Sequence, residues 1–240
     1  MLNKIFTAED FKEGQILLFD KPLGWTSFQV VNKVRWLIRK SCGIKKIKVG
    51  HAGTLDPLAS GLLIICTGKF TKRIVELQGQ EKEYTGTFTL GSTTPSYDLE
   101  TEIDKTFPTD HISEDDLQKA TEKFKGEIEQ IPPVFSALKK DGKRLYEYAR
   151  KGEDVEIKSR KVSITEFEVG TDNFPLINFR VVCSKGTYIR SLAHDFGQEL
   201  SSGAHLSALK RTRIGDFKAE ESLNIESFEK LLPSRENKPA

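Results

Sequence analysis

The sequence has few of the residues that build disulfide frameworks, metal centres or membrane spans. Its three cysteines, Cys42, Cys66 and Cys183, are odd in number and far apart, and its four histidines show no ligand spacing. Neither pattern favours a disulfide network or a zinc site. No apolar run approaches the roughly 20 residues of a membrane span, and the N-terminus lacks a signal-peptide core. We therefore expect a cytoplasmic protein with reduced thiols, no membrane contact and no bound metal.

Carboxylates are also missing from one long basic stretch. Residues 21–75 contain eleven Lys and Arg side chains but a single acid, Asp56. Such a surface suits a polyanion, because every carboxylate that faces phosphate costs Coulomb energy. The near-neutral net charge of +2 conceals this, since residues 81–130 carry thirteen acids against five bases. The asymmetry favours a nucleic acid bound on one side, although a merely solvated basic face remains the alternative.

Asp56 lies in a loop whose neighbours restrict the backbone. Gly50, Gly53 and Gly61 permit positive φ and close approach, while Pro57 biases Asp56 towards an extended or turn geometry. The apolar run at 62–66 predicts a buried strand that anchors this loop in the core. An acid held rigidly at the centre of a basic stretch indicates a functional carboxylate. The competing interpretation is that Asp56 only caps a turn.

The hydrophobic pattern predicts an alternation of strands and helices. Period-two or apolar runs predict strands at 14–20, 62–66, 83–90, 161–169 and 176–183. Three- and four-residue spacing with capping residues predicts helices that begin near 26, 69, 113 and 189. Residues 93–107 are acidic and lack periodicity, so they are expected to form a long surface loop. Residues 130–144 combine prolines with bases and are expected to form an ordered arm, neither helix nor strand.

Several sequence blocks, in this order, resemble the TruB family of tRNA pseudouridine synthases. They are Asp20-Lys21-Pro22, the loop 50–61, Lys82-Glu83-Tyr84, and the segments 183–190, 203–206 and 209–212. The resemblance covers about residues 14–217. It implies an α+β fold with a mixed, mostly antiparallel sheet, flanking helices and an inserted thumb arm at about 130–152. It also implies isomerisation of uridine to pseudouridine at position 55 of the tRNA T loop, without metal, organic cofactor or required protein partner.

The resemblance also implies roles for individual residues. Asp56 matches the essential aspartate, which acts on the flipped uridine either as nucleophile or as electrostatic and acid-base partner. Tyr84 matches the tyrosine that stacks on the target base and is placed to assist proton transfer. Tyr188 and Arg190 match a pair that lines the pocket, the arginine bonding the aspartate. These types suit the chemistry, because a flipped base needs an aromatic wall and a buried carboxylate needs a cation.

Other matching or basic residues are expected to contact RNA. His51 matches the histidine that helps to fill the space left by the flipped base, and Leu209 matches an apolar wall of the pocket. The T arm is expected to be held by a set of cationic side chains: Lys21, Lys33, Arg39, Lys45, Lys46, Lys143 and Arg144.

We expect residues 1–240 to form a single catalytic domain. The segment 218–240 after Phe217 is too short for the RNA-binding PUA domain that many family members carry, so the catalytic domain itself would hold the RNA. A noncatalytic RNA-binding or tRNA-folding module on the same scaffold is the alternative function. Such a module has no need for an acid on a basic face.

Overall fold

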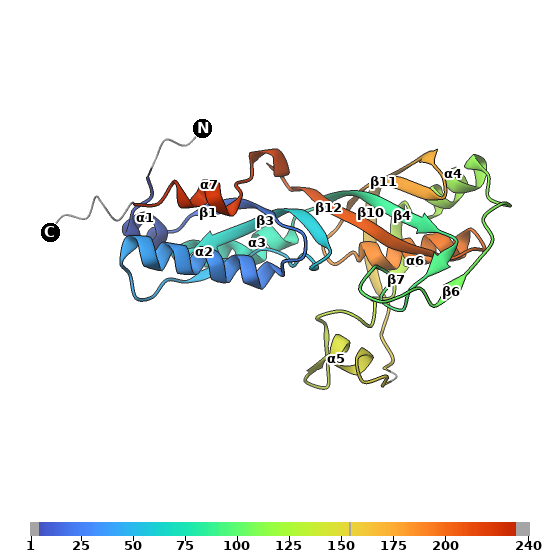
Figure 1. The fold of residues 1–240 in the computed structure, drawn as a ribbon, viewed down its shortest axis with the longest axis horizontal. Coiled ribbons are helices and arrows are strands. Elements are labelled where there is room, and N and C mark those ends of the chain that lie inside the picture. The colour runs from blue at the N-terminus through green and yellow to red at the C-terminus, as the bar shows by residue number, and fades with distance from the viewer. Residues whose placement is uncertain (1–4, 154, 234–240) are drawn as a thin grey trace. The chain divides into compact units, whose positions relative to one another are not determined.

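The computed structural model describes residues 5–153 and 155–233. The chain divides into two compact units, shown with their elements in Figure 1. Unit 1 comprises residues 1–82 and 210–240, and unit 2 comprises residues 83–209. Unit 2 is therefore an insertion between the two segments of unit 1. Whether both fold together as a single catalytic domain stays a prediction.

Unit 1 is built on antiparallel strands. β1 (Ile16–Lys21) pairs with β3 (Ala59–Thr67), with Phe19 opposite Leu63, and β2 (Val49–His51) pairs with β3 as well. The end of β12 (Ala204–Ile214) follows β3 in the sheet and pairs with β13 (Phe217–Lys218). The unit's helices are α1 (Ala8–Glu13), α2 (Ser27–Cys42), η1 (Gly68–Arg73), α3 (Ile74–Gly79), η2 (Ala219–Glu221) and α7 (Ile225–Glu229).

Helix α2 follows directly from its sequence. Thr26 caps it, because its hydroxyl accepts from the Gln29 N–H at 3.1 Å and the Gln29 side chain accepts from the Thr26 N–H at 2.7 Å. Gly43 ends it in the left-handed region at φ 67°. Apolar residues at three- and four-residue spacing are buried along one face, which confirms the helix predicted to begin near residue 26: Val30, Val31, Val34, Leu37 and Ile38.

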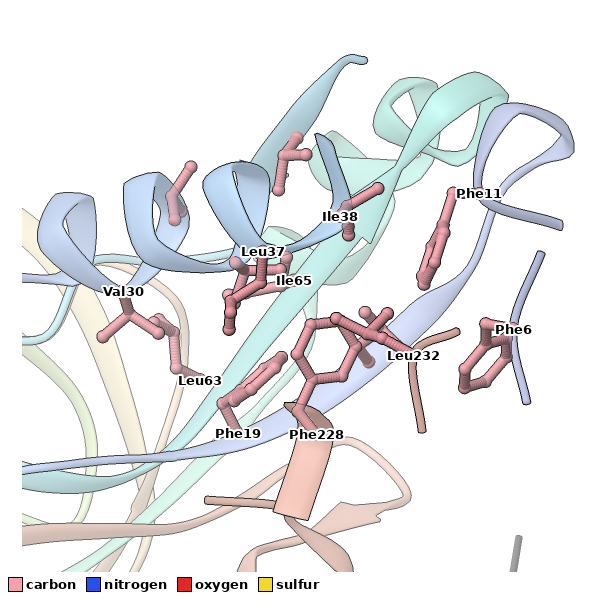
Figure 2. Packing of buried hydrophobic residues seen from close by; sticks show 14 residues of the cluster. Phe6, Phe11, Phe19, Val30, Leu37, Ile38, Leu63, Ile65, Phe228 and Leu232 are labelled. Carbon is pink, nitrogen blue, oxygen red and sulfur yellow. The ribbon is translucent and has the colours of Figure 1, made fainter. Parts of the chain in front are cut away.

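The core of unit 1 combines side chains from its two sequence segments. Phe228 of α7 packs edge-on against Phe19, with ring centroids 5.2 Å apart, and lies 6.2 Å from Phe11 of α1 (Figure 2). Leu232 is buried in the same cluster, beside Phe6. The short segment after Phe217 is therefore structural, because its aromatic and aliphatic side chains complete the core on which α2 rests.

Unit 2 contains the rest of the sheet. β12 is followed in order by β4 (Lys82–Leu90), β11 (Leu176–Cys183), β10 (Arg160–Asn173) and β7 (Gly126–Gln130). Phe88 of β4 stacks on Phe179 of β11 at 4.1 Å and lies 5.8 Å from Phe196. The other elements are β5 (Ser92–Thr93), β6 (Lys105–Thr106), α4 (Glu114–Lys123), β8 (Lys139–Lys140), β9 (Lys143–Arg144), α5 (Leu145–Ala149) and α6 (Ile189–Glu199).

Most predicted elements are confirmed, including the antiparallel pair of β10 and β11. The prediction that residues 93–107 form a long surface loop is wrong in part. β5 and β6 pair within it, and Thr94, Ser96 and Asp98 are buried. The hydroxyls of Thr94 and Ser96 donate to the Asp98 carbonyl at 2.6 and 3.1 Å. The segment is buried through hydrogen bonds between polar residues, so its sequence shows no apolar periodicity from which burial could be predicted.

Two further expectations needed correction. The arm at 130–144 is not free of strands, because β8 and β9 form a short hairpin there, which α5 follows. The strands β7 and β12 were not predicted. β7 contains only one apolar residue, Ile128, and the second half of β12 is basic, so neither shows the alternation that identified β4.

We predict that Phe228→Ala destabilises the protein by about 3–5 kcal/mol, because it removes an aromatic side chain from a closely packed core. Urea unfolding followed by circular dichroism measures this loss. The control is Val75→Ala, since Val75 is 77% exposed. Equal stability of the two variants would contradict the core role of α7.

Candidate active site

The Asp56 loop connects β2 to β3 and is held from beneath by α2. The Ser27 hydroxyl at the start of α2 accepts from the Leu55 N–H at 2.8 Å and donates to the Leu55 carbonyl at 3.0 Å. The Asp56 carbonyl accepts from the Ala59 N–H at 3.1 Å. These three bonds fix the backbone on each side of the half-buried Asp56 side chain. The carboxylate therefore sits on a rigid turn, as the glycine and proline pattern predicted.

Arg211 of β12 supports the same loop from inside unit 1. Its side chain is only 1% exposed. Its Nε donates to the Leu62 carbonyl at 2.8 Å, and its Nη2 and Nη1 donate to the carbonyls of Gly53 at 3.1 Å and Thr54 at 3.4 Å. One guanidinium thus ties the loop to strand β3. In the sequence, Arg211 stood out as part of the block 209–212 that contributes to the family resemblance, and this role was missed.

Lys21 is a second buried cation beside the loop. Its ammonium donates to the carbonyls of Pro22 at 3.0 Å, Pro57 at 3.4 Å and Trp25. Burial lowers the pKa of Lys21 to about 8, while the nearby Asp56 carboxylate raises it. The side chain is fully buried, so its position suits support of the loop and not the contact with phosphate that we expected.

In unit 2, Arg190 is held in the first turn of α6. Its side chain is buried, with Nε 3.5 Å from an Asp98 carboxylate oxygen. Its Nη1 donates to the carbonyls of Phe135 at 2.9 Å and Ser96 at 3.4 Å. Asp98, the partner of the predicted site residue Arg190, was not predicted, because it lies in the segment expected to be a surface loop. The sequence signal that could have indicated a buried acid was the position of Asp98 just after a run of Ser and Thr residues.

Tyr188 precedes α6 and is fixed through its backbone. The Gln130 side chain accepts from the Tyr188 N–H at 2.8 Å and donates to its carbonyl at 3.1 Å. The Arg160 guanidinium lies 4.7 Å from the centre of the Tyr188 ring. Tyr84 is buried on β4, and Leu209 is half-buried in the middle of β12. At the start of α6 itself lie the Tyr188 ring and the guanidinium groups of Arg160 and Arg190.

The predicted site residues are divided between the two units. Asp56 and His51 lie in unit 1, whereas Tyr84, Tyr188, Arg190 and Leu209 lie in unit 2. Burial lowers the pKa of His51, which favours its neutral form. The bond expected between Arg190 and Asp56 would join the units and stays a prediction.

The remaining basic residues of the expected RNA surface lie at the surface. Arg39, Lys45 and Lys46 are exposed and Lys33 is half-buried, all in unit 1. Lys143 and Arg144 are exposed on β9 of the arm in unit 2. Among residues 5–153 and 155–233, no group of three or more His, Cys, Asp or Glu side chains could hold a metal ion. No helix within these residues is long and apolar enough to cross a membrane.

Two family models match this chain. Residues 39–189 match the TruB family pseudouridylate synthase N-terminal domain, and residues 190–239 match the tRNA pseudouridylate synthase B C-terminal domain. A protein of Flavobacterium johnsoniae named tRNA pseudouridine synthase B is 63% identical over 94% of this chain and 99% of its own length. Its namesake in Phocaeicola vulgatus is 61% identical, over 95% and 97%.

A solved structure agrees with these relatives. It is a chain of a Cbf5-Nop10-Gar1 complex, 31% identical, with a TM-score of 0.68. The match covers 92% of this chain and 54% of the solved one, so this chain spans about half of that protein. The mostly antiparallel sheet is thus the fold of the pseudouridine synthases. Within this class, the chain belongs to the TruB family.

We predict that Arg211→Met lowers the free energy of unfolding by about 3 kcal/mol or more, because it leaves buried carbonyls of the Asp56 loop without donors. Thermal melting measures the loss. Arg73→Met is the matched control, since Arg73 pairs with Glu76 at the surface and should contribute little. Similar melting of both variants would show that the loop does not depend on Arg211.

Proposed function

We propose that this protein isomerises uridine to pseudouridine at position 55 in the T loop of tRNA. One observation carries the proposal: a carboxylate, Asp56, sits on a rigid loop beside the buried cation Lys21, in a stretch without any other acid. Membership of the TruB family supports the reaction type, and the names of the relatives support tRNA as substrate. The proposal extends to a cytoplasmic enzyme that acts without metal, organic cofactor or protein partner.

The reaction exchanges one bond to the ribose for another. The bond between uracil N1 and C1′ breaks, the base rotates, and a bond between C5 and C1′ forms. C5 then loses its proton, and N1 gains one, so the product is an isomer of the substrate. The base must first leave its stack to reach a carboxylate on a protein loop. Asp56 acts either by attacking the nucleotide or by stabilising charge and transferring the proton, and both roles require its ionised form.

In this proposal, two cations lie near the Asp56 carboxylate. Lys21 supplies one charge within unit 1, and its own pKa responds to Asp56. We assign Arg190 as the second, with Asp98 holding its guanidinium in place at 3.5 Å.

The aromatic residues would receive the flipped base. In this proposal Tyr84 stacks on uracil, and its hydroxyl assists the transfer of the C5 proton. Tyr188 and Leu209 form further walls, and His51 helps to fill the space left in the RNA. The β8–β9 hairpin, with Lys143 and Arg144 at its surface, grips the T loop from the arm.

Asp56→Asn is expected to abolish pseudouridine formation, because it keeps the side chain's size but removes its charge. The loss in transition-state stabilisation should exceed about 4 kcal/mol, or about a thousandfold in rate. Tritium release from tRNA labelled at uracil C5 measures the reaction, and filter binding measures affinity. Binding should persist, since one negative charge has left a site for a polyanion.

Asp110→Asn is the matched control, because Asp110 is an exposed carboxylate of unit 2. It should turn over tRNA at the normal rate. Tight tRNA binding by the unmodified protein without any tritium release would favour the noncatalytic RNA-binding module. Normal turnover by Asp56→Asn would return Asp56 to the role of a turn residue.

The basic surface should make tRNA binding dependent on salt. We predict that Lys45→Ala combined with Lys46→Ala reduces the slope of log affinity against log salt by about two, since each phosphate contact releases about one counterion. Filter binding across potassium chloride concentrations gives the slope. Lys119→Ala with Lys161→Ala is the control, because these lysines pair with Asp115 and Glu127. An unchanged slope in the Lys45→Ala, Lys46→Ala double variant would show that these two lysines do not contact tRNA phosphates.

A further inference from the structure

Helix α2 carries an exposed tryptophan that the proposed chemistry does not use. The Trp36 side chain is 49% exposed. The Lys33 ammonium lies 4.9 Å and the Lys40 ammonium 4.4 Å from the centre of its ring. A tryptophan between two cations offers both a flat aromatic face and positive charge at one place.

The position of Trp36 is not a consequence of core packing. The inward face of α2 is filled by Val30, Val34, Leu37 and their neighbours, all buried. Trp36 points to the opposite side, together with Phe28, which is 62% exposed. The two rings are eight residues apart, about 12 Å along the helix. Large exposed aromatic side chains on an otherwise polar face favour an interaction surface.

The charge on this face is not neutralised within the protein. Helix α2 contains no Asp or Glu. Within the part of the chain that the structure describes, no ion pair involves Lys33, Arg39 or Lys40. Other surface lysines do find acids, including Lys12 with Glu9, Lys69 with Glu13 and Lys123 with Glu199. Arg35 is excluded from this face because it donates to Asn32 and to the Val49 carbonyl.

We propose that the outer face of α2 is a second RNA contact, at which one unpaired base of the substrate tRNA stacks on Trp36 while Lys33 and Lys40 contact the adjoining phosphates. Stacking needs a flat ring, and phosphate needs the cations, so RNA accounts for both features. An acidic protein segment would account only for the lysines. The proposal takes its RNA from the proposed function.

The helix also links this face to the Asp56 loop. Ser27 at its N-terminus bonds Leu55 directly, and both belong to unit 1. Trp36 lies nine residues further along α2, about 14 Å from Ser27. RNA whose target nucleotide is at Asp56 can therefore reach Trp36 only if it extends beyond that nucleotide. This contact would add affinity without touching the reacting atoms.

The first test measures affinity for a full-length tRNA transcript by filter binding. Trp36→Ala should weaken binding about 5- to 100-fold, the usual effect of losing one stacked base. Trp36→Phe should largely restore affinity, and Trp36→Leu should not, because leucine is apolar but cannot stack. Val75→Ala is the control and should bind normally. In turnover, Trp36→Ala should raise KM and leave kcat unchanged.

The second test uses fluorescence. The chain has two tryptophans, Trp25 and Trp36. In a Trp25→Phe variant, tRNA should quench the emission of Trp36, whereas polyglutamate should not. Each Trp36 variant is first shown to melt like the unmodified protein, as expected for an exposed side chain, and the Trp25→Phe variant is shown to be folded before its emission is measured.

Three results would overturn the inference: affinity of Trp36→Ala within about twofold of normal, equal binding by the Leu and Phe variants, or equal quenching by polyglutamate, which would indicate an acidic protein partner. The proposed function fails separately, through absence of tritium release by the unmodified protein. Affinity and turnover therefore distinguish the two proposals.

Discussion

The placement of Asp56 depends on one buried arginine. Arg211 brings three donors to backbone carbonyls on two segments of unit 1 that are about 150 residues away in sequence. A buried guanidinium is costly unless its donors are satisfied, so the surrounding backbone must keep this geometry. Gly61 is required for the same geometry, because a Cβ atom at this position would lie 2.3 Å from the Arg211 carbonyl oxygen. The Asp56 loop is rigid because the Arg211 hydrogen bonds and the close packing at Gly61 allow its backbone no other conformation.

Unit 2 also contains a buried arginine that donates hydrogen bonds to backbone carbonyls. Arg190 is buried at the start of α6, where carbonyls of the polar turn and the arm accept its hydrogen bonds and Asp98 supplies the opposite charge. Both units thus bury an arginine on a regular element, Arg211 on β12 and Arg190 on α6, and its guanidinium donates to backbone carbonyls. In each, polar residues hold the site, while the aromatic clusters around Phe228 and Phe88 provide stability elsewhere.

The sequence predicted what periodicity and backbone chemistry encode. α2 was recognisable by its cap and apolar spacing, and the Asp56 loop by its glycines and proline. Periodicity could not reveal Asp98, because a buried polar network has no apolar repeat. It also could not reveal the burial of Lys21 and Arg211, since lysine and arginine usually mark a surface and only tertiary structure shows which carbonyls they satisfy.

The interrupted course of unit 1 has a consequence for synthesis of the protein. A ribosome makes residues 1–82 first, then the whole of unit 2, and only then Arg211 and the segment that contains Phe228. Until those residues emerge, the core around Phe11 and Phe19 stays open and the Asp56 loop lacks its guanidinium. Domains generally fold as units during translation. Unit 2 can therefore form while the Asp56 loop is still unsupported, and a chain that stops before residue 211 carries every predicted catalytic residue without the means to hold Asp56 in place.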